Sequence, residues 1–127
     1  MGKERSIENL YIWQEARALV NAVYKMMSLC KDWGFKDQIQ RASVSIMNNI
    51  AEGSESGSDT KFINYLNIAK GSCGEVRSML YLCEDLGYCS TDERITLQSQ
   101  LKKISAGIVR LIQTLSSKTC RLADLTT

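Results

Sequence analysis

The cations near the C-terminus are the side chains of this chain best placed for chemistry, and that chemistry is phosphate binding. Residues 1–93 carry 10 basic and 13 acidic side chains, a balance of −3, whereas residues 94–127 carry 6 basic and 1 acidic, a balance of +5. No acid lies between Arg94 and Leu122. Lys and Arg neutralise phosphates without reading bases. The candidate nucleic-acid-binding residues are Lys102, Lys103, Arg110, Lys118 and Arg121.

An alternative explanation is that these charges only keep an outer helix face in water, as most exposed charges do. Lys103 and Arg110 lie seven residues apart, and Arg121 follows in line if the last helix persists. Such a stripe, repeated around a symmetric assembly, would attract a polyanion.

Catalytic chemistry is poorly supported by the composition. The chain has no His, which removes the commonest general base and metal ligand. Its 5 Cys lack the paired short spacing of a zinc site. We therefore expect no enzyme, no catalytic residue, no metal and no cofactor.

The hydrophobic pattern argues for a reduced, cytoplasmic protein. No apolar run approaches the roughly 20 residues of a membrane span, and the N-terminus lacks the apolar region of a signal peptide. Cys73 and Cys83 fall on an apolar helix face and are expected to be small core residues. No membrane partner is expected.

Hydrophobic spacing predicts an all-α domain over residues 1–127, an antiparallel up-down-up-down four-helix bundle. The predicted helices span about 7–31, 35–52, 59–86 and 91–117, with a tail over 118–127. The expected N-cap of the first helix is Ser6, and that of the third helix is Ser58 or Asp59. Gly87 is expected to end the third helix, and Ser90–Glu93 to form a capping box that opens the fourth. Gly53 is expected to be the left-handed residue that ends the second helix.

Each helix carries an apolar stripe that predicts the core. In the first helix the stripe includes Trp13 and Tyr24. The other predicted core residues are Ile12, Ala16, Leu19, Val20, Val23, Met27 and Cys30; Phe35, Ile39, Ala42, Ile46, Asn49 and Ile50; Phe62, Tyr65, Leu66, Ala69, Cys73, Val76, Met79, Leu80 and Cys83; and Leu97, Leu101, Ile104, Ile108, Leu111, Ile112 and Leu115.

A second, thinner apolar line follows the first helix. Tyr11, Ala18, Ala22 and Leu29 lie at spacings of seven, four and seven, on a side that an isolated bundle would leave in water. An isolated bundle gains nothing from this second line. We therefore expect it to form a homo-oligomer interface.

Two glycines interrupt the third helix. Gly71 and Gly74 each cost about 1 kcal/mol relative to Ala inside a helix, so we expect Ala42, Ser43 and Ser45 to pack closely on them. Glu75, flanked by apolar positions, needs a partner or solvent. Arg41 is its candidate partner, within one subunit or between two; a solvated Glu75 is the alternative.

The same region carries a family resemblance. The run Gln38-Ile39, Arg41-Ala42, Val44-Ser45-Ile46 and Asn49-Ile50-Ala51-Glu52-Gly53, followed by Phe62, Leu66, Ile68-Ala69, Gly71-Ser72 and Glu75, resembles the four-helix-bundle family of 23S ribosomal RNA intervening-sequence proteins. The similarity spans about residues 7–117. Gln40 and Met47 stand where the family usually has an arginine and a proline, so a straighter helix is expected. The family-motif residues are Arg41, Asn49, Glu52, Gly53, Gly71, Ser72 and Glu75.

This resemblance implies a ring-forming, nucleic-acid-associated bundle without enzymatic activity. Related proteins form five-membered rings, so a homopentamer is expected. Similar bundles are accessory proteins of reverse transcriptases in diversity-generating retroelements, which makes a reverse transcriptase a candidate partner. The predicted function is thus an oligomeric accessory protein that binds RNA or DNA; the alternative is a structural or protein-interaction oligomer with no nucleic-acid role.

Overall fold

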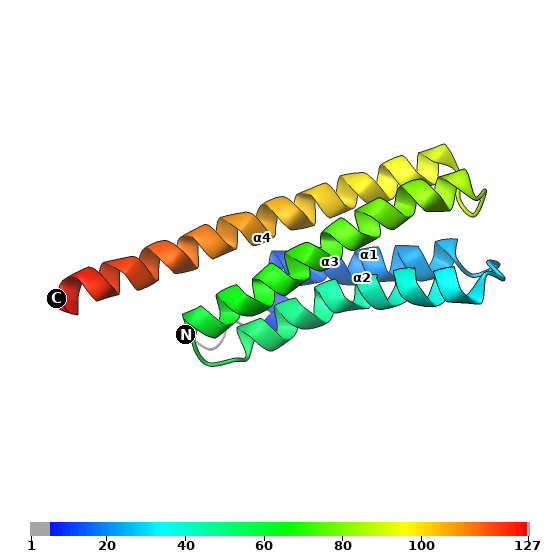
Figure 1. Cartoon of the computed structure of the whole chain (residues 1–127). Coiled ribbons are helices and arrows are strands. Elements are labelled where there is room, and N and C mark those ends of the chain that lie inside the picture. The colour runs from blue at the N-terminus through cyan, green and yellow to red at the C-terminus, as the bar shows by residue number, and fades with distance from the viewer. Residues whose placement is uncertain (1–5, 127) are drawn as a thin grey trace.

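The described residues form a bundle of four antiparallel α-helices (Figure 1). The computed structural model describes residues 6–126, with side chains described as far as Lys118. A short 3-10 helix η1 (Ile7–Asn9) precedes α1 (Tyr11–Met26), α2 (Trp33–Ser54), α3 (Asp59–Asp85) and α4 (Thr91–Thr126). α1 packs on α2 and α4, and α3 packs on the same two helices. The predicted all-α, up-down-up-down bundle is confirmed.

The start of the bundle differs from the single predicted helix over 7–31. Leu10 has an extended backbone, with φ −83° and ψ 117°, and separates η1 from α1. Ser6 precedes η1 but makes no side-chain cap; its hydroxyl instead donates to Glu8 Oε1 at 3.2 Å. α1 ends at Met26, and α2 begins at Trp33, where Asp32 Oδ1 accepts from the Phe35 amide at 3.2 Å.

The other helix termini follow the local sequence signals. Ser58 caps α3 by accepting from the Lys61 amide at 3.1 Å. Gly87, at φ 75°, closes α3, because the Gly87 amide donates to the Glu84 carbonyl and the Tyr88 amide to that of Cys83. In the capping box of α4, Ser90 Oγ accepts from the Glu93 amide at 3.0 Å and the Ser90 amide donates to Glu93 Oε1 at 2.8 Å.

Gly53 lies inside α2, so its predicted role as a left-handed terminus is wrong. A Cβ there would lie 2.7 Å from Phe62 Cδ1 and 2.9 Å from Tyr65 Cβ, so glycine is needed for α2 and α3 to approach. The positive φ of this connection falls at Gly57, at 86°.

The predicted packing around Gly71 and Gly74 is also wrong. Both glycines are exposed, and a Cβ at either position would meet no heavy atom within 4 Å. Ala42 and Ser43 are buried as expected, but the close approaches involve Gly53 and Gly107. A Cβ at Gly107, on α4, would lie 2.5 Å from Ile12 Cγ2 on α1.

The core follows the predicted stripes closely. Tyr24 is a correction, since 46% of it is exposed, and Trp13 is half-buried with the Arg17 guanidinium 5.8 Å from its ring centroid. Val20, Cys30, Asn49, Tyr65, Leu111 and Ile112 are also half-buried. The fully enclosed large side chains include Leu19, Met27, Ile39, Ile46, Phe62, Leu66, Leu80, Leu101 and Ile104.

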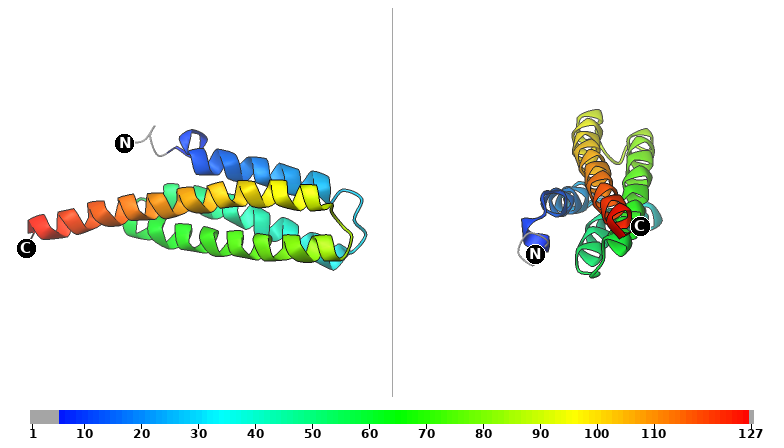
Figure 2. Two further views of the ribbon diagram at one scale, coloured as in Figure 1. Left: turned by 90° about the horizontal axis from the view of Figure 1, so that it is seen from above. Right: turned by 90° about the vertical axis from the view of Figure 1, so that its left-hand side faces the viewer.

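α4 runs to Thr126, so residues 118–126 are helical rather than the predicted tail. No Gly or Pro occurs between Gly107 and the C-terminus to stop the helix. The C-terminal part of α4 projects beyond the end of the other three helices (Figures 1 and 2). Within the described residues, none of the helices is long and apolar enough to cross a membrane.

Candidate nucleic-acid interface

Four of the five predicted phosphate-binding cations lie on the surface of α4. Lys102, Lys103, Arg110 and Lys118 are all exposed. Lys118 Nζ is 3.9 Å from Asp59 Oδ2 at the start of α3, so this cation is partly neutralised. The side chain of Arg121 lies outside the described residues. Lys102, Lys103 and Arg110 therefore remain as the described cations of α4 that can contact a polyanion.

These three cations point to two sides of α4 instead of forming a single stripe. Lys102 lies beside α3, where it lines a groove with Arg77. Arg110 lies toward α1, because its Nη2 is 3.9 Å from the Cβ position of Gly107, which itself packs on Ile12. Lys103 precedes Arg110 by two turns on the same side of the helix. Lys103 and Arg110 thus share one side of α4, and Lys102 belongs to a separate surface.

Arg94 does not add to this interface, because it is held by α3. Its Nε forms a close ion pair with Glu84 Oε1, its Nη1 donates to Gln98 Oε1 at 2.7 Å, and its guanidinium lies 4.9 Å from the Tyr81 ring centroid. The Arg94 contacts, led by its hydrogen bond, hold the pKa of the Glu84 carboxyl below its ordinary value. Arg94 therefore joins α3 to α4.

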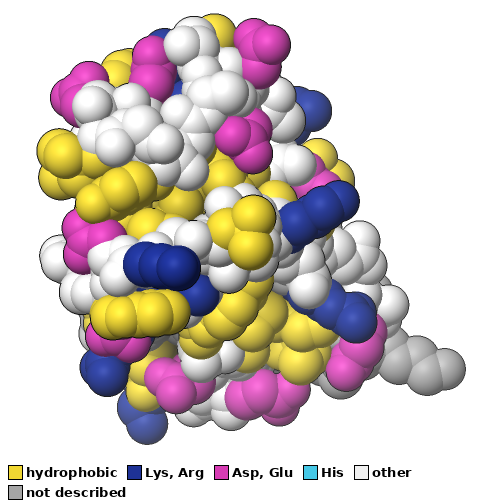
Figure 3. Space-filling model, turned by 90° about the vertical axis from the view of Figure 1, so that its right-hand side faces the viewer, with side chains coloured by type: hydrophobic (Ala, Val, Ile, Leu, Met, Phe, Trp, Pro, Cys, Tyr) yellow, Lys and Arg dark blue, Asp and Glu magenta, His cyan; other side chains and the backbone are white. Residues whose placement is uncertain are grey.

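The end of the bundle where the α1–α2 and α3–α4 connections lie has a surface of mixed charge. Figure 3 shows Lys and Arg interspersed with Asp and Glu among apolar side chains there. This arrangement agrees with the sequence, in which the net positive charge is confined to residues 94–127. The excess of positive charge therefore lies in the part of the sequence that forms α4.

Among the polar family-motif residues, Ser72 joins α3 to α2 through Ser45, and Asn49 supports Ser45 from within α2. Ser45 Oγ and Ser72 Oγ are 2.9 Å apart, and Asn49 Nδ2 donates to both Ser45 Oγ at 3.0 Å and the Ser45 carbonyl at 2.8 Å. Because these groups are partly buried, the hydrogen bonds compensate the loss of water. Sequence reasoning identified Asn49 and Ser72 but missed that Ser45 connects them. The available signal was the spacing of four residues between Ser45 and Asn49, which places both on one side of α2.

Arg41 and Glu75 do not pair within the chain. Arg41 Nε is 2.9 Å from Asp37 Oδ2 on its own helix, and both side chains are exposed. Glu75 is exposed and accepts a long hydrogen bond of 3.5 Å from Gln38 Nε2. Glu52 is also exposed and borders a hollow with Lys61. The solvated alternative for Glu75 fits the single chain.

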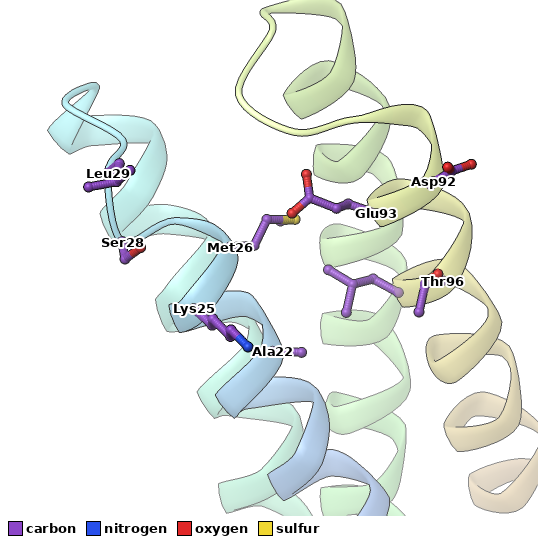
Figure 4. Close-up of a pocket in the computed structure, with 9 residues that line it drawn as sticks. Ala22, Lys25, Met26, Ser28, Leu29, Asp92, Glu93 and Thr96 are labelled. Atoms are coloured by element: carbon purple, nitrogen blue, oxygen red, sulfur yellow. The ribbon is translucent and has the colours of Figure 1, made fainter.

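The predicted interface line, whose last residue Leu29 lies beyond the end of α1, is largely open to solvent. Leu29 is 90% exposed, Tyr11 is 55% exposed, Ala18 is exposed and Ala22 is half-buried. Ala22 and Leu29 border a groove of about 540 Å³ between α1 and α4. Figure 4 shows Met26 reaching across this groove from α1 toward Glu93 on α4, with Ala22 one turn earlier. The lining of this groove combines apolar side chains such as Met26 and Leu97 with the charged side chains Lys25, Asp92 and Glu93.

The two buried thiols, those of Cys73 and Cys83, are unsuited to nucleophilic chemistry. Burial raises the pKa of the Cys73 and Cys83 thiols, so both stay protonated near neutral pH. Within the part of the chain that the structure describes, no three His, Cys, Asp or Glu side chains come together in a way that could hold a metal ion.

Comparison with known proteins places this bundle in a family. The model of the 23S rRNA-intervening sequence protein matches residues 8–110. The chain belongs to this family. A crystal structure of a protein of unknown function from the S23 ribosomal protein family of Bacteroides thetaiotaomicron VPI-5482 has the same fold, with a TM-score of 0.74 and 24% identity over 80% of this chain and 97% of that one. No curated protein sequence matches significantly.

Proposed function

We propose that this member of the 23S rRNA-intervening sequence protein family is a non-enzymatic, oligomeric protein that binds RNA or DNA through phosphates. The main support is the part of α4 from Ile95 to Lys118, which contains no acidic residue and exposes Lys102, Lys103 and Arg110. Family membership, with its link to ribosomal RNA, supports the same proposal.

Assembly is part of the proposal because one chain presents few cations. The open line of Tyr11, Ala18, Ala22 and Leu29 offers the apolar contact, and a homopentamer is the assembly that the family resemblance implies. In a ring, each copy repeats Lys103 and Arg110, which multiplies the attraction for a polyanion. A reverse transcriptase that uses the bound nucleic acid is the proposed enzyme partner.

The test is the double substitution Lys103→Glu with Arg110→Glu, measured by filter binding to single-stranded RNA and to duplex DNA at low salt. Binding should be abolished while the mass by light scattering stays unchanged, because both side chains are exposed and paired with no other described residue. In the wild-type protein the logarithm of affinity should fall linearly with the logarithm of salt concentration.

A matched control carries the same change of charge elsewhere. Lys31→Glu with Lys61→Glu alters two exposed lysines outside α4 and should bind almost as the wild type does. Unchanged affinity and salt slope in the α4 double variant would refute the proposed interface and favour the protein-interaction oligomer.

A further inference from the structure

A groove between α3 and α4 has a distinctly basic lining. It has a volume of about 560 Å³, within the range of protein sites that bind small ligands. The buried side chains Cys73 and Leu101 lie at its base. The remaining lining residues are Lys70, Gly74 and Arg77 on α3, and Gln98, Lys102 and Ser105 on α4.

The groove has three cations and no carboxylate in its lining. No ion pair joins Lys70, Arg77 or Lys102 to another residue of the described chain, and all three side chains are exposed. Glu75, although adjacent to Gly74, is directed to α2, where it accepts from Gln38. The positive charge in the groove is therefore uncompensated, and an anion would be attracted to it.

Two carboxylates at the ends of the same helix pair lie beside other cations. Glu84 pairs with Arg94 toward the α3–α4 connection, and Asp59 lies 3.9 Å from Lys118 at the start of α3. Gln98 is fixed between these helices, since it accepts from Arg94 and its Nε2 donates to the Arg77 carbonyl at 3.4 Å. The part of the groove wall that Gln98 forms is therefore held by hydrogen bonds without a ligand.

Gly74 explains why the groove is open. Glycine inside a helix costs about 1 kcal/mol relative to alanine, yet a Cβ here would meet no heavy atom within 4 Å. Close helix packing therefore does not require this glycine. Its absent side chain instead leaves one wall of the groove clear between Lys70 and Arg77, which lie two turns apart, or roughly 10 Å along the helix.

From these observations we infer that the α3–α4 groove binds the phosphates of a single-stranded polynucleotide, with Lys70, Arg77 and Lys102 contacting phosphate oxygens. This inference rests on the proposed nucleic-acid function and adds a second surface, on α3, to the Lys103 and Arg110 pair. A single strand is favoured because a flexible backbone can enter a recess two helical turns long. Duplex DNA is stiff over about 150 base pairs and cannot bend into it.

A matched pair of glycine substitutions tests the groove without changing its charge. Gly74→Gln places a side chain in the groove, whereas Gly71→Gln places the same side chain at an exposed helical position that does not line it. Both variants should remain helical and be at least as stable as the wild type. By fluorescence anisotropy with a labelled 20-nucleotide oligouridylate at low salt, Gly74→Gln should bind at least tenfold more weakly and Gly71→Gln as the wild type.

A charge variant gives an independent readout. Arg77→Gln keeps the helix but removes one phosphate contact, so the magnitude of the salt slope should fall by about 0.7 for the single strand. A 20-base-pair duplex, which reaches only the outer face of α4, should be affected little by Gly74→Gln. Equal weakening of the single strand and the duplex would overturn the assignment to single strands.

The outcomes separate this inference from the function on which it rests. If Gly74→Gln and Arg77→Gln bind the oligonucleotide as the wild type does while Lys103→Glu with Arg110→Glu does not bind, the groove is not the site and the proposed function stands. If the wild-type protein binds no oligonucleotide at low salt, both are wrong.

Discussion

At the scale of single residues, the glycines of this bundle have three different roles. Gly87 supplies the positive φ that closes α3, Gly53 and Gly107 allow close helix contact, and Gly74 leaves a groove open. The sequence alone does not distinguish these roles. Only the role of Gly87, at the end of a helix, can be predicted from nearby residues without knowing the neighbouring helices. The role of a helical glycine depends on what faces it.

Gly107 should be the least replaceable of these helical glycines. In Gly107→Ala the new Cβ would lie 2.5 Å from Ile12 Cγ2, and Ile12 is buried and stiff because it is β-branched. The exposed Gly71→Ala is the matched control, since it gains the same helix propensity of up to about 1 kcal/mol without a clash.

The difference between these two variants isolates the packing cost. Urea denaturation should show Gly107→Ala less stable than Gly71→Ala by about 1–3 kcal/mol in the free energy of unfolding. Equal free energies for the two variants would show that α1 shifts freely to accommodate the methyl group.

At the scale of helices, sequence predicted the periodicity and most of the local termini. The Ser90–Glu93 capping box, the Ser58 cap and the Gly87 terminus are interactions within a few residues, so their sequence signals were sufficient. The extended Leu10 that separates η1 from α1 has no such local signal. The continuation of α2 through Gly53 was missed because its cause is a contact with α3.

The candidate site was predicted only in part, because some of its features depend on contacts between helices. The acid-free run of α4 is a property of composition, and Lys103 and Arg110 were identified from it. Lys70 and Arg77 were missed because a groove between two helices depends on how those helices meet. The spacing Lys70, Gly74, Arg77 places all three on one side of α3, which was the available signal.

The two connections at one end of the bundle are joined by a hydrogen bond. Tyr88 Oη donates to Asp32 Oδ2 at 2.7 Å, and Tyr88 also packs edge-on against Phe35, with ring centroids 5.4 Å apart. The Tyr88 hydroxyl first, and then the Phe35 amide, lower the pKa of the Asp32 carboxyl; the same bond raises the pKa of Tyr88.

This bond should make the effect of Tyr88→Phe depend on pH. A carboxyl with a lowered folded-state pKa contributes stability above its unfolded pKa of about 3.9, and this contribution is lost as the pH falls through the folded value. Tyr88→Phe should therefore lower Tm at pH 7 and lower it less at pH 2.

NMR titration of the variant should also show the Asp32 pKa returning toward its ordinary value. The phenyl ring introduced by Tyr88→Phe retains the ring contact with Phe35, so the comparison isolates the hydroxyl. An equal loss of Tm at both pH values would mean that the bond with ionised Asp32 contributes nothing to the stability of the fold.

At the scale of the whole molecule, assembly and nucleic-acid binding should be coupled. A single chain offers Lys103 and Arg110 on one side of α4 and the groove on the other, whereas a ring repeats both surfaces along one strand. Linked sites raise overall affinity through effective concentration without any new contact. The gain exists only for a strand long enough to span two copies.

Ala22→Glu should prevent assembly without altering the cations that bind nucleic acid. Ala22 borders the α1–α4 groove beside Leu29, and a carboxylate there would add to the charges of Asp92 and Glu93, which also line the groove. The variant should remain helical by circular dichroism and fall to the monomer mass by light scattering. Asn21→Glu is the control, since it adds the same charge at an exposed neighbouring position that does not line the groove.

The length of the strand should then decide how much affinity the monomer loses. A short oligonucleotide that reaches only one copy should bind Ala22→Glu and the wild type equally, because the cations of α3 and α4 are untouched. A long strand should bind the monomeric variant at least a hundredfold more weakly, within the range that multivalency provides, and with a shallower salt slope. An unchanged affinity for the long strand in a monomeric variant would show that each bundle binds nucleic acid alone.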